Sequence, residues 1–275
     1  MAGIMENIFE PILLPLEDVI TETPTIKTFV MRPDPPIHFR AGQFMQLLVP
    51  GIGEAPFTPS SSPYEPEKME ITIMKAGMVT EALHQLKPGD IVGLRGPFGK
   101  GYPIEKFNDK EILIVGGGVG LAPLRSLILT LFHDIDKVKR VSIKYGAKRP
   151  DELVFQRMYD EWSGKNKVDM TITIDSPYPG WQGKVGLVTE LLNGMDIDLG
   201  NSFAVSCGPE VMLRFVTLTL LNVGFAPKQI YLSMNRNMSC GMGICGRCNV
   251  GPYYLCKDGP DMNYEKIKDI PGALG

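Results

Sequence analysis

Apolar and polar residues alternate in short runs over the first third of the chain. The runs are separated by Gly, Pro, Asp and Asn, which favour turns, so the pattern predicts a small antiparallel β-barrel. A helix is expected at 79–86, capped by Thr80 and closed by a Pro88-Gly89-Asp90 turn. The expected strands are IKTFVM (26–31), QFMQLLV (43–49), MEITIM (69–74) and DIVGLRG (90–96).

The pattern changes near Lys110, where longer apolar strands alternate with helical stretches. This alternation predicts a parallel sheet with helices on both faces. The sequence 111–132 predicts a buried strand, a glycine turn and an apolar helix, and further strands are expected at 140–147, 168–175, 203–208 and 230–234. The expected domains are an antiparallel β-barrel (1–107), an α/β domain (108–233) and a cysteine-rich C-terminal segment (234–275).

Composition and charge narrow the possible classes of protein. The chain has 275 residues, of which 44% are hydrophobic, so it can build two cores and an appendage. The net charge is −3 without a long basic run, which argues against nucleic acid as a partner. The N-terminus lacks the cationic start of a signal peptide, and the apolar segment 121–132 is too short to span a bilayer. We therefore expect a cytoplasmic protein without a membrane span.

A glycine-rich turn joins the first strand and the first helix of the α/β domain. Glycine lets the backbone approach a pyrophosphate, and a helix N-terminus offers free N–H groups and positive potential. The strict G-x-G-x-x-G pattern is absent because Pro123 takes the third glycine position, but proline suits the first turn of a helix. A tight turn without a ligand is the alternative, and the strand–turn–helix context favours a dinucleotide. The turn contains Gly116, Gly117, Gly118 and Gly120.

Two later stretches add to this site. Gly183 and Gly186 precede a helix expected to be capped by Thr189, and a strand ends at Cys207-Gly208 before another helix. Strand ends of one polarity converge on the crevice where ligands bind. Cys207 has the alternative of being a small buried apolar residue.

Four of the five cysteines lie close together near the end of the chain. The first two gaps of Cys240-x4-Cys245-x2-Cys248-x7-Cys256 are those of a plant-type ferredoxin loop, which favours a [2Fe–2S] cluster. A zinc site is the alternative, but zinc sites usually use two matched short pairs. Glycines between the cysteines let the loop turn so that backbone N–H groups face the sulfurs. These glycines are Gly241, Gly243 and Gly246.

The β-barrel, the α/β domain with its glycine-rich turn and the cysteine-rich tail, in this order, resemble the ferredoxin–NADP reductase superfamily. Within it they are most similar to electron-transfer subunits with a cysteine-rich tail: the gamma subunits of cytoplasmic NAD(P)-linked hydrogenases (sulfhydrogenases), the corresponding subunit of anaerobic sulfite reductase, and the dihydroorotate dehydrogenase electron-transfer subunit. The resemblance covers essentially the whole chain, in the stretches 41–63, 77–103 and 115–123 and in the tail.

The resemblance implies that the barrel binds FAD. The family's Arg-x-Tyr-Ser stretch corresponds to Ala55-Pro56-Phe57-Thr58, so Phe57 would supply the aromatic face and Thr58 the hydroxyl near the reactive flavin nitrogen. Because Ala55 replaces the arginine, FMN stays an alternative. Arg95 is a candidate replacement cation, and a surface ion pair is its alternative. The implied flavin residues are Pro56, Phe57, Thr58, Ser61, Gly77, Val79 and Thr80, of which the last three begin a helix that would meet the pyrophosphate.

The resemblance also assigns a nicotinamide dinucleotide to Gly116, Gly117, Gly118 and Gly120. It places Cys207 and Gly208 beside the nicotinamide, so Thr58 and Cys207 are the implied catalytic residues. Lys148 and Arg149 are either a grip for a 2′-phosphate or a solvated turn, which leaves NAD(H) and NADP(H) both open.

A nicotinamide exchanges two electrons as hydride, an iron–sulfur cluster takes one, and a flavin can do both. We therefore expect an NAD(P)H-dependent flavin oxidoreductase subunit that passes electrons between NAD(P)(H) and a partner through FAD and a [2Fe–2S] cluster on Cys240, Cys245, Cys248 and Cys256. The expected partners are other subunits of a redox complex, of the hydrogenase or heterodisulfide-reductase type. Dihydroorotate dehydrogenase or anaerobic sulfite reductase is the alternative partner, and a scaffold subunit with a structural zinc tail is the alternative class.

Overall fold

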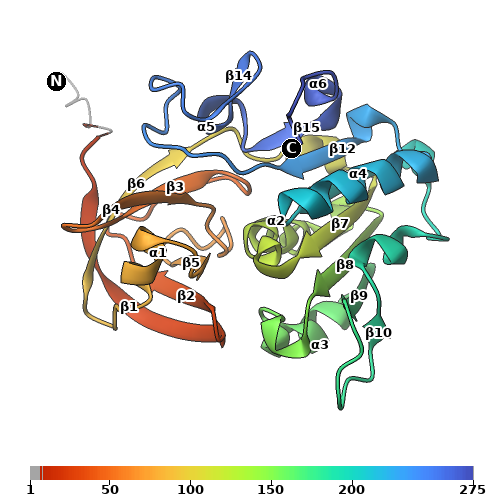
Figure 1. Ribbon diagram of the computed structural model, residues 1–275, viewed down its shortest axis with the longest axis horizontal. Coiled ribbons are helices and arrows are strands. Elements are labelled where there is room, and N and C mark those ends of the chain that lie inside the picture. Colours follow the sequence, from red (N-terminus) through yellow and green to blue (C-terminus); the bar gives the residue numbers. More distant parts are fainter. Residues whose placement is uncertain (1–6, 8, 275) are drawn as a thin grey trace.

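Six antiparallel strands form the first lobe of the molecule, at the left of Figure 1, in the order β4-β3-β6-β1-β2-β5. The structure is a computed structural model and describes residue 7 and residues 9–274. The predicted barrel strands are confirmed, whereas β1 and β4 were not predicted. The strands are β1 (Ile12–Thr23), β2 (Ile26–Met31), β3 (Phe44–Val49), β4 (Gly53–Phe57), β5 (Met69–Met74) and β6 (Ile91–Phe98).

The helix of the barrel, α1 (Met78–Leu83), differs from the prediction at its start. Gly77 is the N-cap residue, and Thr80 lies inside the first turn. The Thr80 Oγ1 atom reaches back and accepts from the N–H groups of Ala76 at 2.8 Å and Gly77 at 2.9 Å. The predicted Thr80 cap is therefore wrong by one turn, because Thr80 satisfies N–H groups before the helix from inside it.

The second lobe is a seven-stranded sheet in the order β10-β9-β8-β7-β11-β12-β15. All its pairings are parallel except that of β12 with β15, which confirms the predicted parallel sheet. The elements are β7 (Glu111–Gly117), α2 (Leu121–His133), β8 (Arg140–Ala147), α3 (Tyr159–Ser163), β9 (Val168–Ile174), β10 (Lys184–Val185), β11 (Ser202–Cys207), α4 (Glu210–Val223) and β12 (Ile230–Ser233).

The helix predicted to begin at Thr189 is only a short 3₁₀ helix, Val188–Leu192, with Leu187 as its N-cap residue. The N-cap position predicted for Thr189 therefore belongs to Leu187, and the Glu190 carboxylate reaches back to accept from the Leu187 N–H at 3.2 Å.

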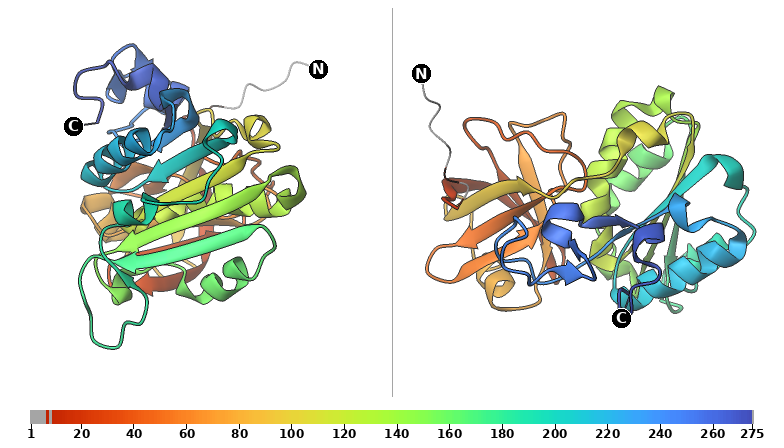
Figure 2. Two further views of the ribbon diagram at one scale, coloured as in Figure 1. Left: turned by 90° about the vertical axis from the view of Figure 1, so that its right-hand side faces the viewer. Right: turned by 90° about the horizontal axis from the view of Figure 1, so that it is seen from above.

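The C-terminal segment lies over the junction between the two lobes (Figures 1 and 2). Its strand β15 pairs antiparallel with β12, with Leu232 opposite Met262. A strand of three residues is too short to produce a recognisable pattern, so β15 was not predicted. The segment contains β13 (Asn249–Val250), β14 (Tyr253–Tyr254), α5 (Leu255–Asp258), β15 (Asp261–Asn263) and α6 (Tyr264–Ile267).

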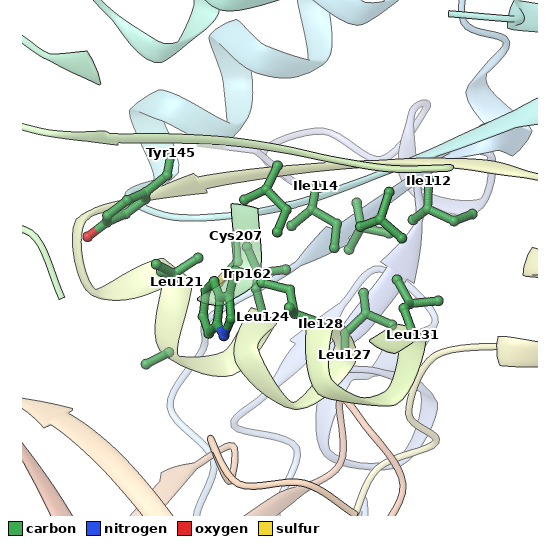
Figure 3. Packing of buried hydrophobic residues seen from close by; sticks show 14 of the residues in the cluster. Ile112, Ile114, Leu121, Leu124, Leu127, Ile128, Leu131, Tyr145, Trp162 and Cys207 are labelled. Carbon is green, nitrogen blue, oxygen red and sulfur yellow. The ribbon is translucent and has the colours of Figure 1, made fainter. Parts of the chain in front are cut away.

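Helix α2 lies between the parallel sheet and the barrel (Figures 1 and 3). Its leucines point toward Ile112 and Ile114 of β7, and α4 packs on the opposite face of the sheet. A helix covered on both sides is apolar almost all round, which explains the unbroken apolar run in the sequence. The fully buried residues of α2 include Leu121, Leu124, Leu127, Ile128 and Leu131.

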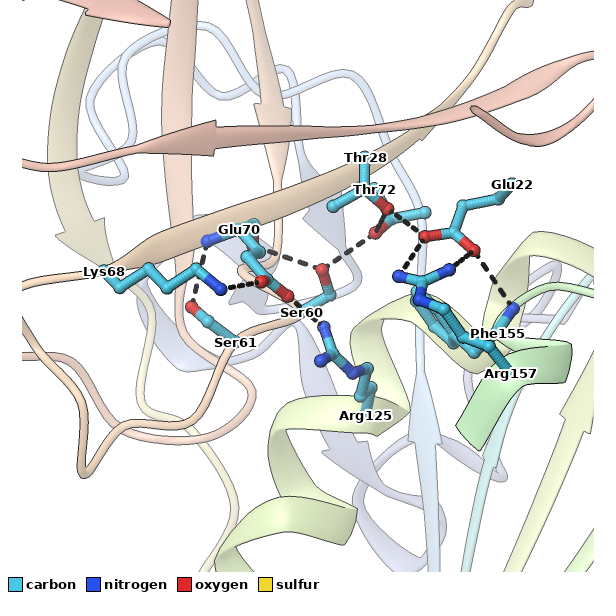
Figure 4. Close-up of polar contacts among 10 residues, drawn as sticks. All are labelled: Glu22, Thr28, Ser60, Ser61, Lys68, Glu70, Thr72, Arg125, Phe155 and Arg157. Atoms are coloured by element: carbon cyan, nitrogen blue, oxygen red, sulfur yellow. Dashed lines mark hydrogen bonds and ion pairs between the residues drawn. The ribbon is translucent and has the colours of Figure 1, made fainter. Parts of the chain in front are cut away.

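Buried ion pairs join α2 to the barrel (Figure 4). Arg125 of α2 forms an ion pair with Glu70 of β5, and both side chains are 8% exposed. Lys68 binds the other oxygen of Glu70 at 2.7 Å. Burial raises the pKa of Glu70, but Arg125 and Lys68 outweigh it, so the net pKa lies below its usual value. A second bridge joins Glu22 of β1 to Arg157, which precedes α3, at 2.8 Å.

We predict that Arg125→Met lowers the free energy of unfolding by about 3–5 kcal/mol, because it leaves the Glu70 carboxylate buried without its main partner. Urea unfolding at neutral pH measures this loss. Arg149→Met is the matched control, since Arg149 forms an exposed pair with Asp151, and it should change stability by less than about 0.5 kcal/mol. A loss for Arg125→Met no larger than that of the control would contradict the prediction.

Candidate functional site

The strand order of the second lobe creates a switch point next to β7. From β7 the chain moves to β8, β9 and β10 on one side and then returns to β11 and β12 on the other. In open parallel sheets, ligands bind in the crevice outside the carboxyl ends of the two strands at this point. Gly116 of β7 is paired with Cys207 of β11 at that edge. The structure therefore brings together the two stretches that the sequence predicts for a dinucleotide, Gly116–Gly120 and Cys207–Gly208.

The glycines of this turn have different roles. A Cβ on Gly120 would lie 2.7 Å from Gly208 Cα, so the backbone of β11 packs directly on the turn. Gly118 has a φ of +54° with open space around it, and its carbonyl accepts from the Tyr145 hydroxyl at 3.0 Å. Gly120 is thus required by packing, while Gly118 leaves room for a ligand.

The thiol of Cys207 faces the barrel side of the sheet, within the apolar cluster around α2 (Figure 3). Burial raises the pKa of this thiol to about 12, although the side chain of Ser233 opposes the shift. The thiol therefore stays protonated near neutral pH and cannot act as a base or a thiolate nucleophile. At this edge it can supply a neutral contact surface.

A buried carboxylate that sequence reasoning missed lies next to Cys207. Asp261 of β15 is 8% exposed, and among the described residues neither of its oxygens makes a hydrogen bond. The hydroxyl of Tyr102 and the side chain of Ser233 face it without reaching hydrogen-bonding geometry, and a Cβ on Gly42 would overlap it. Burial raises the pKa of Asp261 to about 7. The barrel and the carboxyl edge of the sheet thus meet around a titratable group.

The predicted flavin stretch lies on and just after β4. Pro56 and Phe57 pair with Gln46 and Met45 of β3, and Phe57 is half-buried at the rim of the barrel. Helix α1 packs on β4, with Val79 against Gly53, so the two predicted flavin motifs are brought together. Thr58 follows β4 and is half-buried.

Ser61 differs from the other predicted flavin residues. It is buried, and its Oγ accepts from the Glu70 N–H at 3.1 Å. The neighbouring Ser60 hydroxyl bonds that of Thr72 at 2.8 Å (Figure 4). These serines therefore have a structural role in the link between the flavin stretch and β5.

The surroundings of Arg95 differ from both environments suggested by the sequence, a flavin phosphate and a surface ion pair. Arg95 is 7% exposed, forms a two-pronged ion pair with Glu54 at 2.6 and 2.9 Å, and donates to the carbonyls of Ser239 at 3.0 Å and Cys240 at 3.3 Å. Its guanidinium thus faces the cysteine loop, so neither a surface ion pair nor a cation for the flavin phosphate describes it. The reason is that β6 runs under the C-terminal segment, which the sequence did not reveal.

Lys148 and Arg149 follow β8 on the surface. Arg149 forms an exposed ion pair with Asp151 at 2.8 Å, and Lys148 is exposed. Both side chains therefore face solvent at the surface.

Backbone N–H groups surround the cysteine sulfurs. Met242 and Ile244 donate to the Cys240 sulfur at 3.3 Å each, and Gly243 donates to the Cys256 sulfur at 3.0 Å. The glycines at 241, 243 and 246 have φ values of +81°, +75° and +74°, which side chains other than glycine rarely allow. The expected purpose of these glycines, to turn N–H groups toward sulfur, is met in the structure.

The four cysteines lie together in this loop. The Cys240 thiol interacts with that of Cys245, and the Cys256 thiol interacts with those of Cys248 and Cys240. Within the described part of the chain, no three Cys, His, Asp or Glu side chains converge on a point that could hold one metal ion. Burial raises the pKa of Cys240, but the N–H donors outweigh it and lower that pKa to about 6. The N–H donors therefore favour the thiolate form of Cys240, which is the form that binds metal.

Each segment matches a family of known domains. Residues 13–102 match the oxidoreductase FAD-binding domain, and residues 114–217 match the oxidoreductase NAD-binding domain. Residues 235–268 match the iron–sulfur cluster binding domain of dihydroorotate dehydrogenase B.

Relatives match along nearly the whole chain. Sulfhydrogenase 1 subunit gamma of Pyrococcus furiosus is 36% identical over 270 residues, which cover 93% of this chain and 91% of the relative. A probable dihydroorotate dehydrogenase B electron transfer subunit of Methanocaldococcus jannaschii is 35% identical, and the match covers 95% of this chain and 93% of the relative. Among solved structures, an NADH-dependent reduced ferredoxin-NADP oxidoreductase superposes with a TM-score of 0.77 at 24% identity, covering 100% of this chain and 94% of the other.

The fold and the matching domain families together define a flavoprotein oxidoreductase with a ferredoxin–NADP reductase-like fold and an iron–sulfur binding tail. The chain belongs to the family of electron-transfer subunits that contains the sulfhydrogenase gamma subunits and the dihydroorotate dehydrogenase B electron transfer subunits. None of the helices in the described residues has the length and apolar character needed to cross a bilayer.

We predict that Asp261→Asn stabilises the protein more at pH 8 than at pH 5. The pKa of Asp261 is about 7 in the folded protein against an ordinary 3.8, so the folded state holds the proton more tightly. The cost of the carboxylate therefore grows as the pH rises from about 4 to about 7, by about 1.4 kcal/mol per pH unit, and is constant above.

Urea unfolding at both pH values tests this, and the gain should be larger at pH 8 by roughly 2–3 kcal/mol. Asp136→Asn is the control, because Asp136 is almost fully exposed. An equal gain at the two pH values would show that Asp261 does not titrate in this range.

Proposed function

We propose that this chain passes electrons between NAD(P)(H) and a partner redox subunit through FAD and a [2Fe–2S] cluster, with NAD(H) as the favoured nucleotide. The domains would be 1–107 for FAD, 108–233 for the dinucleotide and 234–275 for the cluster. The observation that carries the proposal is that the barrel contacts both other sites. Glu54 of β4 and Arg95 of β6 hold the cysteine loop, and Gly42 and Tyr102 of the barrel lie against Asp261 beside Cys207.

When bound, the flavin accepts a hydride and releases electrons singly, which joins a two-electron carrier to a one-electron centre. The chain itself would bind the flavin and the dinucleotide and orient them toward each other. Phe57 would lie against the ring and Thr58 would donate near its reactive nitrogen. Cys207, which keeps its proton, would pack beside the nicotinamide. The remaining binding residues would be Pro56, Gly77, Val79 and Thr80 for the flavin, with Ser61 holding the flavin stretch to β5, and Gly116, Gly117, Gly118, Gly120 and Gly208 for the dinucleotide.

Four clustered thiols with the first two gaps of a plant-type ferredoxin loop suit a [2Fe–2S] cluster better than a single zinc ion. Cys240, Cys245, Cys248 and Cys256 would hold its two iron atoms. The N–H donors to sulfur would stabilise the added negative charge of the reduced cluster. Clustered thiols of this kind fit a reducing compartment, so we propose the cytoplasm as the location.

The partner would contact the open side of the cysteine loop, where Ile244 is 73% exposed and Cys245 is exposed. Met234 and Met238 are buried and pack the loop, so they are not part of such a surface. A hydrogenase or heterodisulfide-reductase type complex is the favoured partner, because a sulfhydrogenase gamma subunit is 36% identical to this chain. A dihydroorotate dehydrogenase is the second candidate, on the likeness to its electron transfer subunits.

We predict that the purified protein contains FAD and two iron atoms per chain, and that NADH bleaches its flavin absorption. Cys245→Ser should abolish the iron–sulfur signals in absorption and electron paramagnetic resonance, because it removes one ligand. The rate of flavin reduction by NADH should stay within about twofold, since the proposed flavin and dinucleotide residues lie on the barrel and the sheet and not in the cysteine loop.

Ile244→Ser, one residue away and not a ligand, is the control and should keep its cluster. A colourless protein with one zinc ion per chain would favour the scaffold alternative. Loss of flavin reduction in a folded Cys245→Ser variant would contradict the order nicotinamide, flavin, cluster.

A further inference from the structure

Arg95 joins the flavin barrel to the cysteine loop. Its guanidinium forms two hydrogen bonds with the Glu54 carboxylate and donates to the carbonyls of Ser239 and Cys240. Arg95 and Cys240 are 145 positions apart in the sequence, so this is a long-range contact. The side chain of Arg95 is 6% exposed, and that of Glu54 is 29% exposed. A charge on the barrel is therefore buried against the residue whose thiol would be the first cluster ligand.

Two neighbours of Arg95 hold the same loop. The Gln46 amide on β3 donates to the Met238 carbonyl at 2.9 Å and more weakly to that of Ser239 at 3.4 Å. The Phe98 ring lies 5.4 Å from the guanidinium carbon, and a Cβ on Gly241 would come within 2.8 Å of that ring. Four successive positions, 238–241, are thus fixed by barrel side chains.

The link is continuous with the flavin stretch. Glu54 is on β4, the strand that carries Pro56 and Phe57, and β4 pairs with β3, which carries Gln46. A planar guanidinium can bind a carboxylate and two carbonyls at once, which the point charge of a lysine cannot do with the same geometry. A buried ion pair of this kind contributes little net stability but fixes one arrangement of the groups it joins.

We propose that Arg95, oriented by Glu54, is a positioning residue for the one-electron step between flavin and cluster. It fixes the Cys240 side of the loop against the barrel, and its positive charge stabilises the reduced cluster and so raises the reduction potential. The step moves one electron from the reduced flavin to the cluster, and Arg95 exchanges no proton or electron in it. This inference rests on the proposed function.

The test compares Arg95→Met, Arg95→Lys and Glu54→Gln with the control Arg32→Met, whose arginine pairs with Glu17 at the surface. The cluster potential is measured by redox titration followed by electron paramagnetic resonance. The rates of flavin and cluster reduction after mixing with NADH are measured by stopped-flow absorption. Iron and flavin contents and circular dichroism are recorded for each variant.

For Arg95→Met we expect the reduction equilibrium of the cluster to fall about tenfold, which is about 59 mV for one electron. Cluster reduction should slow about tenfold while flavin reduction is unchanged. Arg95→Lys keeps the charge but loses the planar fork, so it should recover most of the potential and only part of the rate. Glu54→Gln leaves the arginine charge unbalanced and should raise the potential. Arg32→Met should match the wild type.

Wild-type potential and wild-type cluster reduction in a folded, iron-loaded Arg95→Met variant would overturn this inference and leave the proposed function standing. If Arg95→Met does not load iron, the sign of the Glu54→Gln shift decides: a rise supports the inference, and no change or a fall overturns it. A wild-type protein without flavin or iron would instead refute the proposed function itself.

Discussion

The buried contact between helix α2 and the barrel is the constraint on which the other sites depend. The first turn of α2 follows the glycine turn at the switch point, and Arg125, one turn further, pairs with Glu70 of the barrel. The Arg125 guanidinium also lies 4.9 Å from the centre of the Phe155 ring. The same helix therefore sets the position of the dinucleotide turn and its distance from the barrel. Transfer of a hydride requires the reacting atoms to lie within van der Waals contact. A rigid helix between the two lobes keeps the distance between them fixed.

The C-terminal segment is held by two different kinds of contact. Strand β15 continues the parallel sheet by backbone hydrogen bonds to β12, and the barrel binds the residues before Cys240 through Gln46 and Arg95. The cysteine loop itself has little regular structure, since its backbone N–H groups are turned toward sulfur. A loop of this kind takes its position from its attachments at both ends, and these attachments come from both lobes.

Polar groups are buried where these segments meet, although apolar residues would be more favourable there. Asp261 and Tyr102 lie at the carboxyl edge of the sheet without hydrogen-bond partners among the described residues, beside the neutral thiol of Cys207. Stability is often lower at functional sites, because chemistry requires groups that packing alone would not select. The concentration of such groups at the junction of barrel, sheet and tail agrees with the proposed placement of the reacting atoms there.

Local patterns in the sequence determined most elements and most candidate ligands. Alternation predicted β2, β3, β5 and β6, and the run of strand, glycines and apolar helix predicted β7 and α2, because these signals depend on neighbours within one element. The spacing of the four cysteines with their glycines likewise predicted a metal-binding loop. Only the tertiary structure decided what Arg95 binds, that Asp261 is buried, and that β15 joins the sheet. Each of these depends on contacts between residues far apart in the chain, and the energy of such a contact exists only after the lobes have packed.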